Sequence, residues 1–217
     1  MCCIMGNGVL QGTSVVIGIC GTNFCTFWAD GRKIVDDDSA DGGFRIEGDD
    51  HFQKIFKLNS RVLFGAAGWF SANSDLTDAV KEIPDIEHAS VRMVRNAVVN
   101  YIRHLPMRHR VLASGYLVGG KHHDGTFSIY EISWNQEKDR VQVIERRPAP
   151  PATNYGISLM LPFGEPELVQ KVVAATGSQL SKSRDHSDLI HKINEVVYTI
   201  STIDESVGPE AMSLSVF

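Results

Sequence analysis

Several features are scarce in this chain of 217 residues, and each absence excludes a class of protein. No run of apolar residues approaches the roughly 18 that a membrane-spanning helix needs. Basic residues are in no excess, because 21 Lys and Arg stand against 26 Asp and Glu, and a net charge of −5 is unusual for a dedicated nucleic-acid binder. The amino-terminal residues lack the basic region and long apolar core of a signal peptide. These absences predict a cytoplasmic protein with no membrane and no nucleic-acid partner.

Cysteine is also scarce, and its placement argues against a disulfide scaffold. A disulfide framework would spread cysteines along the chain, and a zinc site favours a CxxC pair, which is missing. Cys20 and Cys25 flank the turn-like residues 21–24, so they are expected to face each other across a hairpin as free thiols. All four cysteines lie in the first 25 residues, at Cys2, Cys3, Cys20 and Cys25.

Motifs for cofactors are missing as well. The sequence has neither a GxGxxG pattern nor a P-loop, so nucleotide binding has no local support. The run His122-His123-Asp124 is interpreted as a solvated turn between strands rather than a metal site. We therefore expect no cofactor and no metal.

The chain does contain alternating strand-like and helix-like segments. Apolar residues at helical spacing predict helices at 72–83, 88–105, 166–180 and 186–202. Segment 35–50, with six aspartates and several glycines, predicts a loop, and 148–151 predicts a stiff proline connector. Runs rich in β-branched and aromatic residues predict strands at 13–20, 24–30, 52–58, 61–67, 110–119, 126–133, 140–146 and 210–217.

This order of elements predicts the fold class. Strands, two helices, strands, two helices and a last strand are typical of a single layered α+β domain. The first two strands, 13–20 and 24–30, are apolar without clean alternation, so their sheet is expected to be covered on both faces.

Four short segments, in a fixed order, carry a resemblance to a known family. Gly12-Thr13-Ser14-Val15-Val16 is similar to a junction where cleavage before Thr frees a nucleophile, and Phe27-Trp28-Ala29-Asp30-Gly31-Arg32 is similar to an Ala-Asp-x-Arg segment. Asp50-His51-Phe52-Gln53-Lys54-Ile55-Phe56 resembles a segment that holds an active-site lysine, and Phe64-Gly65-Ala66-Ala67-Gly68 resembles an Ala-Gly turn. Together with Val207-Gly208-Pro209 before the last strand, this set resembles the proteasome β-subunit family of N-terminal-nucleophile hydrolases.

The resemblance implies a fold and an activity. The fold is an α+β, four-layer αββα sandwich of two antiparallel sheets flanked by helix pairs. Residues 1–12 would be a candidate propeptide, and 13–217 the N-terminal-nucleophile hydrolase domain. The activity is that of a threonine endopeptidase, which cleaves peptide or unfolded-protein substrates inside a homo- or hetero-oligomeric ring.

The resemblance also implies the site residues and their roles. The α-amine of Thr13 would be the base for its own hydroxyl, Lys54 would supply positive charge, and Asp30 would hold Lys54 in place. The N–H of Gly68 would face the oxyanion. The implied catalytic set is Thr13, Asp30, Lys54, Gly68, Asp204 and Ser206. The implied lining of the first specificity pocket is Lys33, Phe52, Phe56, Ala66 and Phe70.

Two alternatives stay open at the level of sequence. Residues 154–158 stand where the family has a Gly-Ser-Gly segment, and Asp204 and Ser206 are two positions apart where the family spaces them by three. These departures favour a non-catalytic, unprocessed β-type subunit or scaffold. The second alternative is an amidohydrolase whose nucleophile is Cys2, exposed by removal of Met1.

Overall fold

The computed structural model describes residues 15–36, 44–46, 51–67, 70–106, 115–150, 155–160, 166–183, 185–204 and 207–217. The helices are α1 (Phe70–Lys81), α2 (Val91–His104), α4 (Pro166–Lys182) and α5 (His186–Ser201), with a 3-10 turn at Ile86–His88. The first strands are β1 (Val16–Cys20), β2 (Cys25–Asp30), β3 (Ile34–Asp36), β4 (Phe44–Ile46), β5 (Ile55–Lys57) and β6 (Val62–Ala67). The later strands are β7 (Gly115–Lys121), β8 (Phe127–Asn135), β9 (Arg140–Arg146), β10 (Gly156–Met160) and β11 (Ala211–Val216).

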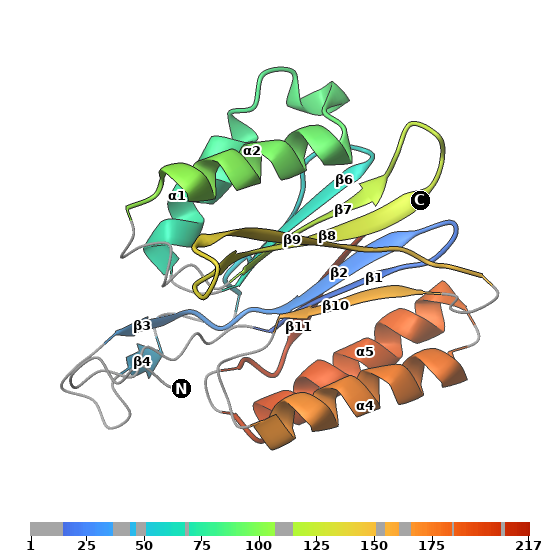
Figure 1. Ribbon diagram of the computed structural model, residues 1–217. Helices are drawn as coiled ribbons and strands as arrows, with labels where there is room; N and C mark the ends of the chain where they lie inside the picture. The colour runs from blue at the N-terminus through green and yellow to red at the C-terminus, as the bar shows by residue number, and fades with distance from the viewer. Residues whose placement is uncertain are drawn as a thin grey trace.

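Two antiparallel sheets form the centre of the molecule, and a small third sheet stands beside them. One sheet has the order β10-β1-β2-β11 and the other the order β5-β6-β7-β8-β9, while β3 and β4 pair with each other. Helices α1 and α2 cover the outer face of the five-stranded sheet, and α4 and α5 cover the outer face of the four-stranded sheet (Figure 1). The mixed α+β class and the two antiparallel sheets are as the sequence predicts.

Alternating side chains on each strand supply the apolar contacts between these elements. On β1, Ile17 and Ile19 pack with α5, whereas Val16 packs between the two sheets. On β6, Phe64 faces the helix α2 side and Leu63 faces the space between the sheets. Both faces of these central strands are buried, which explains why their sequences lack a polar face.

The residues at the two ends of helix α2 explain where the helix begins and where it ends. The hydroxyl of Ser90 accepts a hydrogen bond from the N–H of Met93 at 3.2 Å and so caps the first turn. Pro106 follows the helix, as expected for a residue that cannot continue one. The predicted stripe is buried against the sheet through Val91, Val94, Val98 and Ile102.

Two sequence predictions about strands need correction. Residues 156–160 were not expected to form a strand, yet Gly156–Met160 is β10 and pairs with β1. Ile157 and Leu159 alternate with Ser158, which is a strand pattern, but five residues give it little weight beside the neighbouring prolines. Segment 35–50 is not wholly a loop either, because its described parts pair as β3 and β4.

The solvated turn predicted at 122–124 is also only partly right. His123 and Asp124 are exposed, but His122 is buried and its Nε2 lies 2.7 Å from the hydroxyl oxygen of Ser128. Burial lowers the pKa of His122, which keeps the ring neutral near pH 7. Among the described residues, no group of three or more His, Cys, Asp or Glu side chains could hold a metal ion.

The thiols of the first hairpin lie as predicted. Cys20 and Cys25 are opposite each other in the register of β1 and β2, and both are buried free cysteines. Burial raises the pKa of Cys20 to about 11 and that of Cys25 well above its usual range. These side chains therefore act as small apolar groups in the core.

Two glycines provide a test of this architecture. Gly120 has a φ of 145°, and a Cβ there would overlap the carbonyl oxygen of Arg61, so Gly120→Ala should destabilise the protein by more than about 1 kcal/mol. Gly177 lies inside α4 with open space around its Cα, so Gly177→Ala should stabilise by about 0.5–1 kcal/mol. Urea unfolding measures both, and equal effects of the two variants would contradict the described backbone at Gly120.

Candidate active site

Asp30 is the last residue of β2, in the interior of the four-stranded sheet. Strand β2 has β1 on one side and β11 on the other, so Asp30 is enclosed by both neighbours. Its side chain has no exposed area. A carboxylate is costly to bury unless charges and hydrogen bonds compensate for lost water, so its partners define this region.

The described residues give the Asp30 carboxylate one cation and three peptide donors. Lys54 Nζ lies 2.8 Å from Oδ2, and the N–H of Val15 donates to Oδ1 at 2.8 Å. The N–H groups of Arg32 and Gly208 donate to Oδ2 at 3.1 and 3.2 Å. One side chain thus connects the start of β1, the end of β2, the chain before β5 and the chain before β11.

Lys54 is held as closely as its partner. Its side chain is only 4% exposed, so the ammonium lies in the protein interior and not in solvent. Its carbonyl oxygen accepts a hydrogen bond from the N–H of Ala66 at 3.0 Å, and the nearby N–H of Phe52 donates to the carbonyl of Gly31 at 2.7 Å. The expected contact between Asp30 and Lys54 is therefore present, and both main-chain bonds fix the lysine segment relative to β2 and β6.

Three of the predicted catalytic residues, Thr13, Gly68 and Ser206, lie outside the described residues. Their sequence neighbours nevertheless converge on the ion pair. Val15 and Gly208 donate to Asp30, and Ala66 donates to the main chain of Lys54. Segments that are distant in sequence thus meet around one buried charge pair.

Asp204 follows the end of α5. Its N–H donates to the carbonyl of Ile200 at 2.9 Å, and its own carbonyl accepts from the N–H of Val207 at 3.1 Å. These bonds link the end of α5 to Val207, the residue before Gly208. A catalytic role for the Asp204 side chain stays a prediction.

The predicted pocket residues have different surroundings. Lys33 and Phe52 are half-buried. Phe56 packs on the helix side of β5, where its ring lies 6.3 Å from that of Phe64 and 4.9 Å from Lys81 Nζ. Ala66 is 4% exposed in the same apolar cluster. Phe70 begins α1, and its side chain lies outside the described part, so the pocket stays a prediction.

No sequence pattern indicates the peptide N–H donors around Asp30. Those of Val15 and Arg32 carry no residue-type signal, because every residue except proline has such a group. The Gly208-Pro209 pair predicts a turn but no contact with Asp30. These donors matter chemically, since hydrogen bonds compensate a buried carboxylate for the water that it loses.

The arrangement places a fixed positive charge in a site shielded from water. A lysine ammonium in such surroundings stabilises negative charge that develops nearby more strongly than it would in water. It also disfavours protonation of an adjacent amine. The site is therefore suited to activating a nucleophile at the start of β1.

Replacement of Asp30 and replacement of Lys54 should destabilise the protein to different extents. Asp30→Asn leaves the Lys54 ammonium buried without its carboxylate and should destabilise by about 3–5 kcal/mol. Lys54→Met should cost less, because three peptide N–H groups still bind the carboxylate. Urea unfolding compares them with Lys57→Met, an exposed control expected within about 0.5 kcal/mol of the parent. A Lys54→Met cost that equals or exceeds that of Asp30→Asn would contradict this account.

Comparison with known proteins supports the fold. No family model matches the sequence, and no curated protein matches it. Among solved structures the chain resembles eukaryotic HslV from Trypanosoma brucei, with a TM-score of 0.54, 12% sequence identity, and coverage of 93% of this chain and 98% of that chain. HslV is a proteasome-like N-terminal-nucleophile hydrolase, and at this identity the likeness shows the fold alone. The predicted relationship is thus confirmed at the level of fold.

Proposed function

We propose that this protein is a threonine endopeptidase of the proteasome β type, with the four-layer αββα fold of N-terminal-nucleophile hydrolases. Thr13 is its nucleophile, and it is freed from residues 1–12 by cleavage after Gly12. The observation that carries the proposal is the buried Asp30–Lys54 pair tied to Val15. The likeness to HslV, a threonine protease of the proteasome family, supports the same reading.

The link from Asp30 to Val15 supports Thr13 as the nucleophile. Val15 donates to one oxygen of Asp30 while Lys54 binds the other. Thr13 precedes Val15 by two residues, and two residues of extended chain span at most about 7 Å. A nucleophile at position 13 is therefore within reach of the Lys54 ammonium, whereas Cys2 is separated from Val15 by many more residues.

The reaction would follow from the charges already described. The free α-amine of Thr13 takes the hydroxyl proton as the oxygen attacks the carbonyl carbon of the scissile peptide bond. The Lys54 ammonium keeps that amine neutral and stabilises the developing oxyanion together with the N–H of Gly68. The proton then passes to the leaving amine, and water hydrolyses the resulting ester to regenerate Thr13.

The proposal also covers the substrate that binds near the Asp30–Lys54 pair and the assembly in which the protein acts. An extended peptide would pair with the strand edges near residues 33–35 and 66–68, and Lys33, Phe52, Phe56, Ala66 and Phe70 would line its first pocket. Asp204 and Ser206 would support the site from the turn before β11. The HslV-like fold favours a cytoplasmic ring of proteasome-like subunits acting on peptides or unfolded proteins. No described helix is long and apolar enough to cross a membrane.

Intact mass and amino-terminal sequencing test the nucleophile. The parent protein should lose residues 1–12 and start at Thr13, and Thr13→Ala should keep them and lose peptidase activity on a fluorogenic peptide. Removing the attacking group should lower the rate by at least about 10³-fold. Cys2→Ala is the matched control and should leave processing and activity unchanged.

The same measurements identify the non-catalytic alternative. A mass that always includes residues 1–12, together with no peptidase activity in the parent, would overturn the enzymatic proposal. Activity lost in Cys2→Ala but kept in Thr13→Ala would instead assign the nucleophile to Cys2. Lys54→Met, once purified and folded, should be processed slowly, which separates loss of chemistry from loss of structure.

A further inference from the structure

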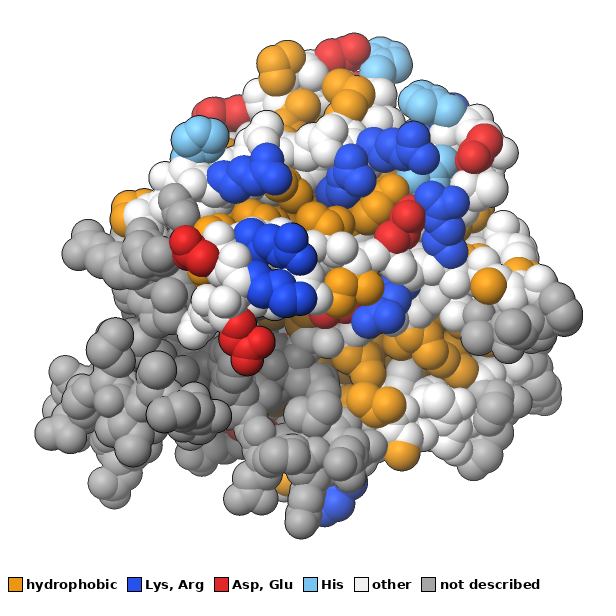
Figure 2. Space-filling view, viewed as in Figure 1, with side chains coloured by type: hydrophobic (Ala, Val, Ile, Leu, Met, Phe, Trp, Pro, Cys, Tyr) orange, Lys and Arg blue, Asp and Glu red, His pale blue; other side chains and the backbone are white. Residues whose placement is uncertain are grey.

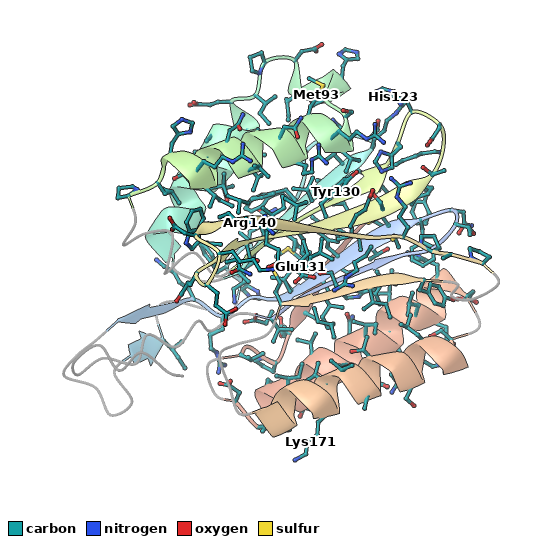
Figure 3. All side chains as sticks on the ribbon, viewed as in Figure 1. Met93, His123, Tyr130, Glu131, Arg140 and Lys171 are labelled. Carbon is teal, nitrogen blue, oxygen red and sulfur yellow. The ribbon has the colours of Figure 1, made fainter. Side chains whose placement is uncertain are left out.

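A groove lies between α2 and the edge of the five-stranded sheet, away from Asp30 and Lys54. Its volume is about 430 Å³, and it is lined by Arg103 of α2, Trp134 of β8 and residues 139–143 at the start of β9. Figure 3 shows Arg140 at the end of β9 nearest this groove. The lining thus combines an aromatic ring, aliphatic side chains, two guanidinium groups and one carboxylate, that of Asp139.

Strand β9 gives the groove an open backbone edge. Among the described strands of its sheet, β9 is the last and pairs only with β8. Val143 is 40% exposed and Arg140 is exposed beside it. An exposed sheet edge pairs readily with an added strand, and a peptide bound in this way takes its specificity from the flanking side chains.

The face around the groove is basic. Figure 2 shows Lys and Arg side chains gathered around hydrophobic ones over α2 and the β8–β9 edge. Acidic side chains also occur here: Arg147 lies 2.6 Å from Glu145, and Arg146 lies 3.6 Å from Glu131. The basic residues of α2 and of segment 127–147 outnumber the acidic ones by seven to four: they are Arg92, Arg95, Arg103, Lys138, Arg140, Arg146 and Arg147, against Glu131, Glu137, Asp139 and Glu145. An occupant of the groove is therefore expected to be acidic.

The chain itself contains a segment of that chemistry. Residues 36–50 hold seven carboxylates and one arginine, so this segment carries a net charge of −6 in a chain whose net charge is −5. The rest of the chain is therefore slightly positive. The segment and the groove have opposite charge.

The described parts of the acidic segment belong to neither of the two large sheets. Strands β3 and β4 have three residues each and form a sheet of their own, apart from the two main sheets (Figure 1). Ile46 on β4 is 46% exposed. A two-stranded ribbon is marginally stable in water, and a third strand or a packing partner stabilises it.

We propose that the acidic segment 36–50 of a second copy of this chain binds in the groove. It adds its strand to the free edge of β9, its carboxylates face Arg103 and Arg140, and an apolar side chain packs against Trp134. This inference rests on the proposed ring assembly and names the contact between neighbouring subunits. Each copy offers one groove and one acidic segment, and such a head-to-tail contact between unlike surfaces generates rings when the rotation closes.

Charge reversal tests the contact. Arg103→Glu/Arg140→Glu should raise the dissociation constant of the full-length assembly by at least roughly tenfold, because like charges would then face each other. Asp37→Arg/Asp38→Arg should do the same, and combining all four changes should restore assembly. Sedimentation velocity at two salt concentrations is the measurement. Unchanged assembly in either reversal, or no recovery in the combination, would overturn the proposal.

The matched control is a charge reversal on another face. Lys171 is exposed on α4, far from Arg140 (Figure 3), so Lys171→Glu should leave the dissociation constant unchanged. All variants should unfold at urea concentrations close to the parent's, since the substituted side chains are on the surface. A comparable loss of assembly in Lys171→Glu would show that net charge, and not the groove, governs association.

Photocrosslinking identifies the occupant directly. Val143 replaced by p-benzoylphenylalanine should crosslink to a peptide within residues 33–51 of an isotopically heavy copy mixed with the light one. Crosslinks only within one copy, or to another region, would overturn the intermolecular contact. A parent protein that stays monomeric would overturn both this contact and the ring, while processing at Thr13 and peptidase activity would still report separately on the nucleophile.

Discussion

The buried pair of Asp30 and Lys54 constrains how the rest of the chain is arranged. A carboxylate with no exposed area and an ammonium with almost none are stable only in contact with each other and with further donors. Those donors come from the residues that precede β1 and β11 and from the end of β2. The two sheets therefore have to meet at one position and in one register, because any slip would leave a charge in the core without a partner.

Most of the remaining interior is apolar, and apolar contacts constrain the positions of atoms less strictly. Three clusters of buried side chains join helices to sheet, sheet to sheet and sheet to helices. Contacts of this kind tolerate exchange of one apolar side chain for another of similar volume. The charge pair is different, because its energy depends on the position of a few atoms. The position of the Asp30–Lys54 pair is thus a stricter requirement of this fold than the packing of its apolar core.

The distribution of charge gives the molecule two contrasting regions. A weakly acidic chain contains one strongly acidic segment, and the face over α2 and β9 is basic. A net charge of −5 does not by itself say where the charges lie. The contrast between segment and face is the basis of the proposed association of like chains through unlike surfaces.

Much of the fold could be predicted from local pattern, and the exceptions have physical reasons. The stripe on α2, the β1–β2 hairpin and the order of helix pairs follow from periodicity and turn residues, which act over a few positions. Strand β10 was missed because five residues carry too weak an alternation, and its position was settled by pairing with β1. His122 was misjudged because its burial depends on Ser128 across a turn, which no residue-type rule reveals.

The sequence by itself determined the α+β class, most strands and helices, and the set of residues that resembles a threonine hydrolase site. Only the tertiary structure decided that Lys54 turns into the protein to meet Asp30, since a lysine among apolar neighbours fits either solvent or a buried carboxylate equally well. Only it revealed that Val15, Arg32 and Gly208 offer their N–H groups to the same carboxylate. Such main-chain donors are common to nearly all residue types, and their direction is set by the path of the chain in space.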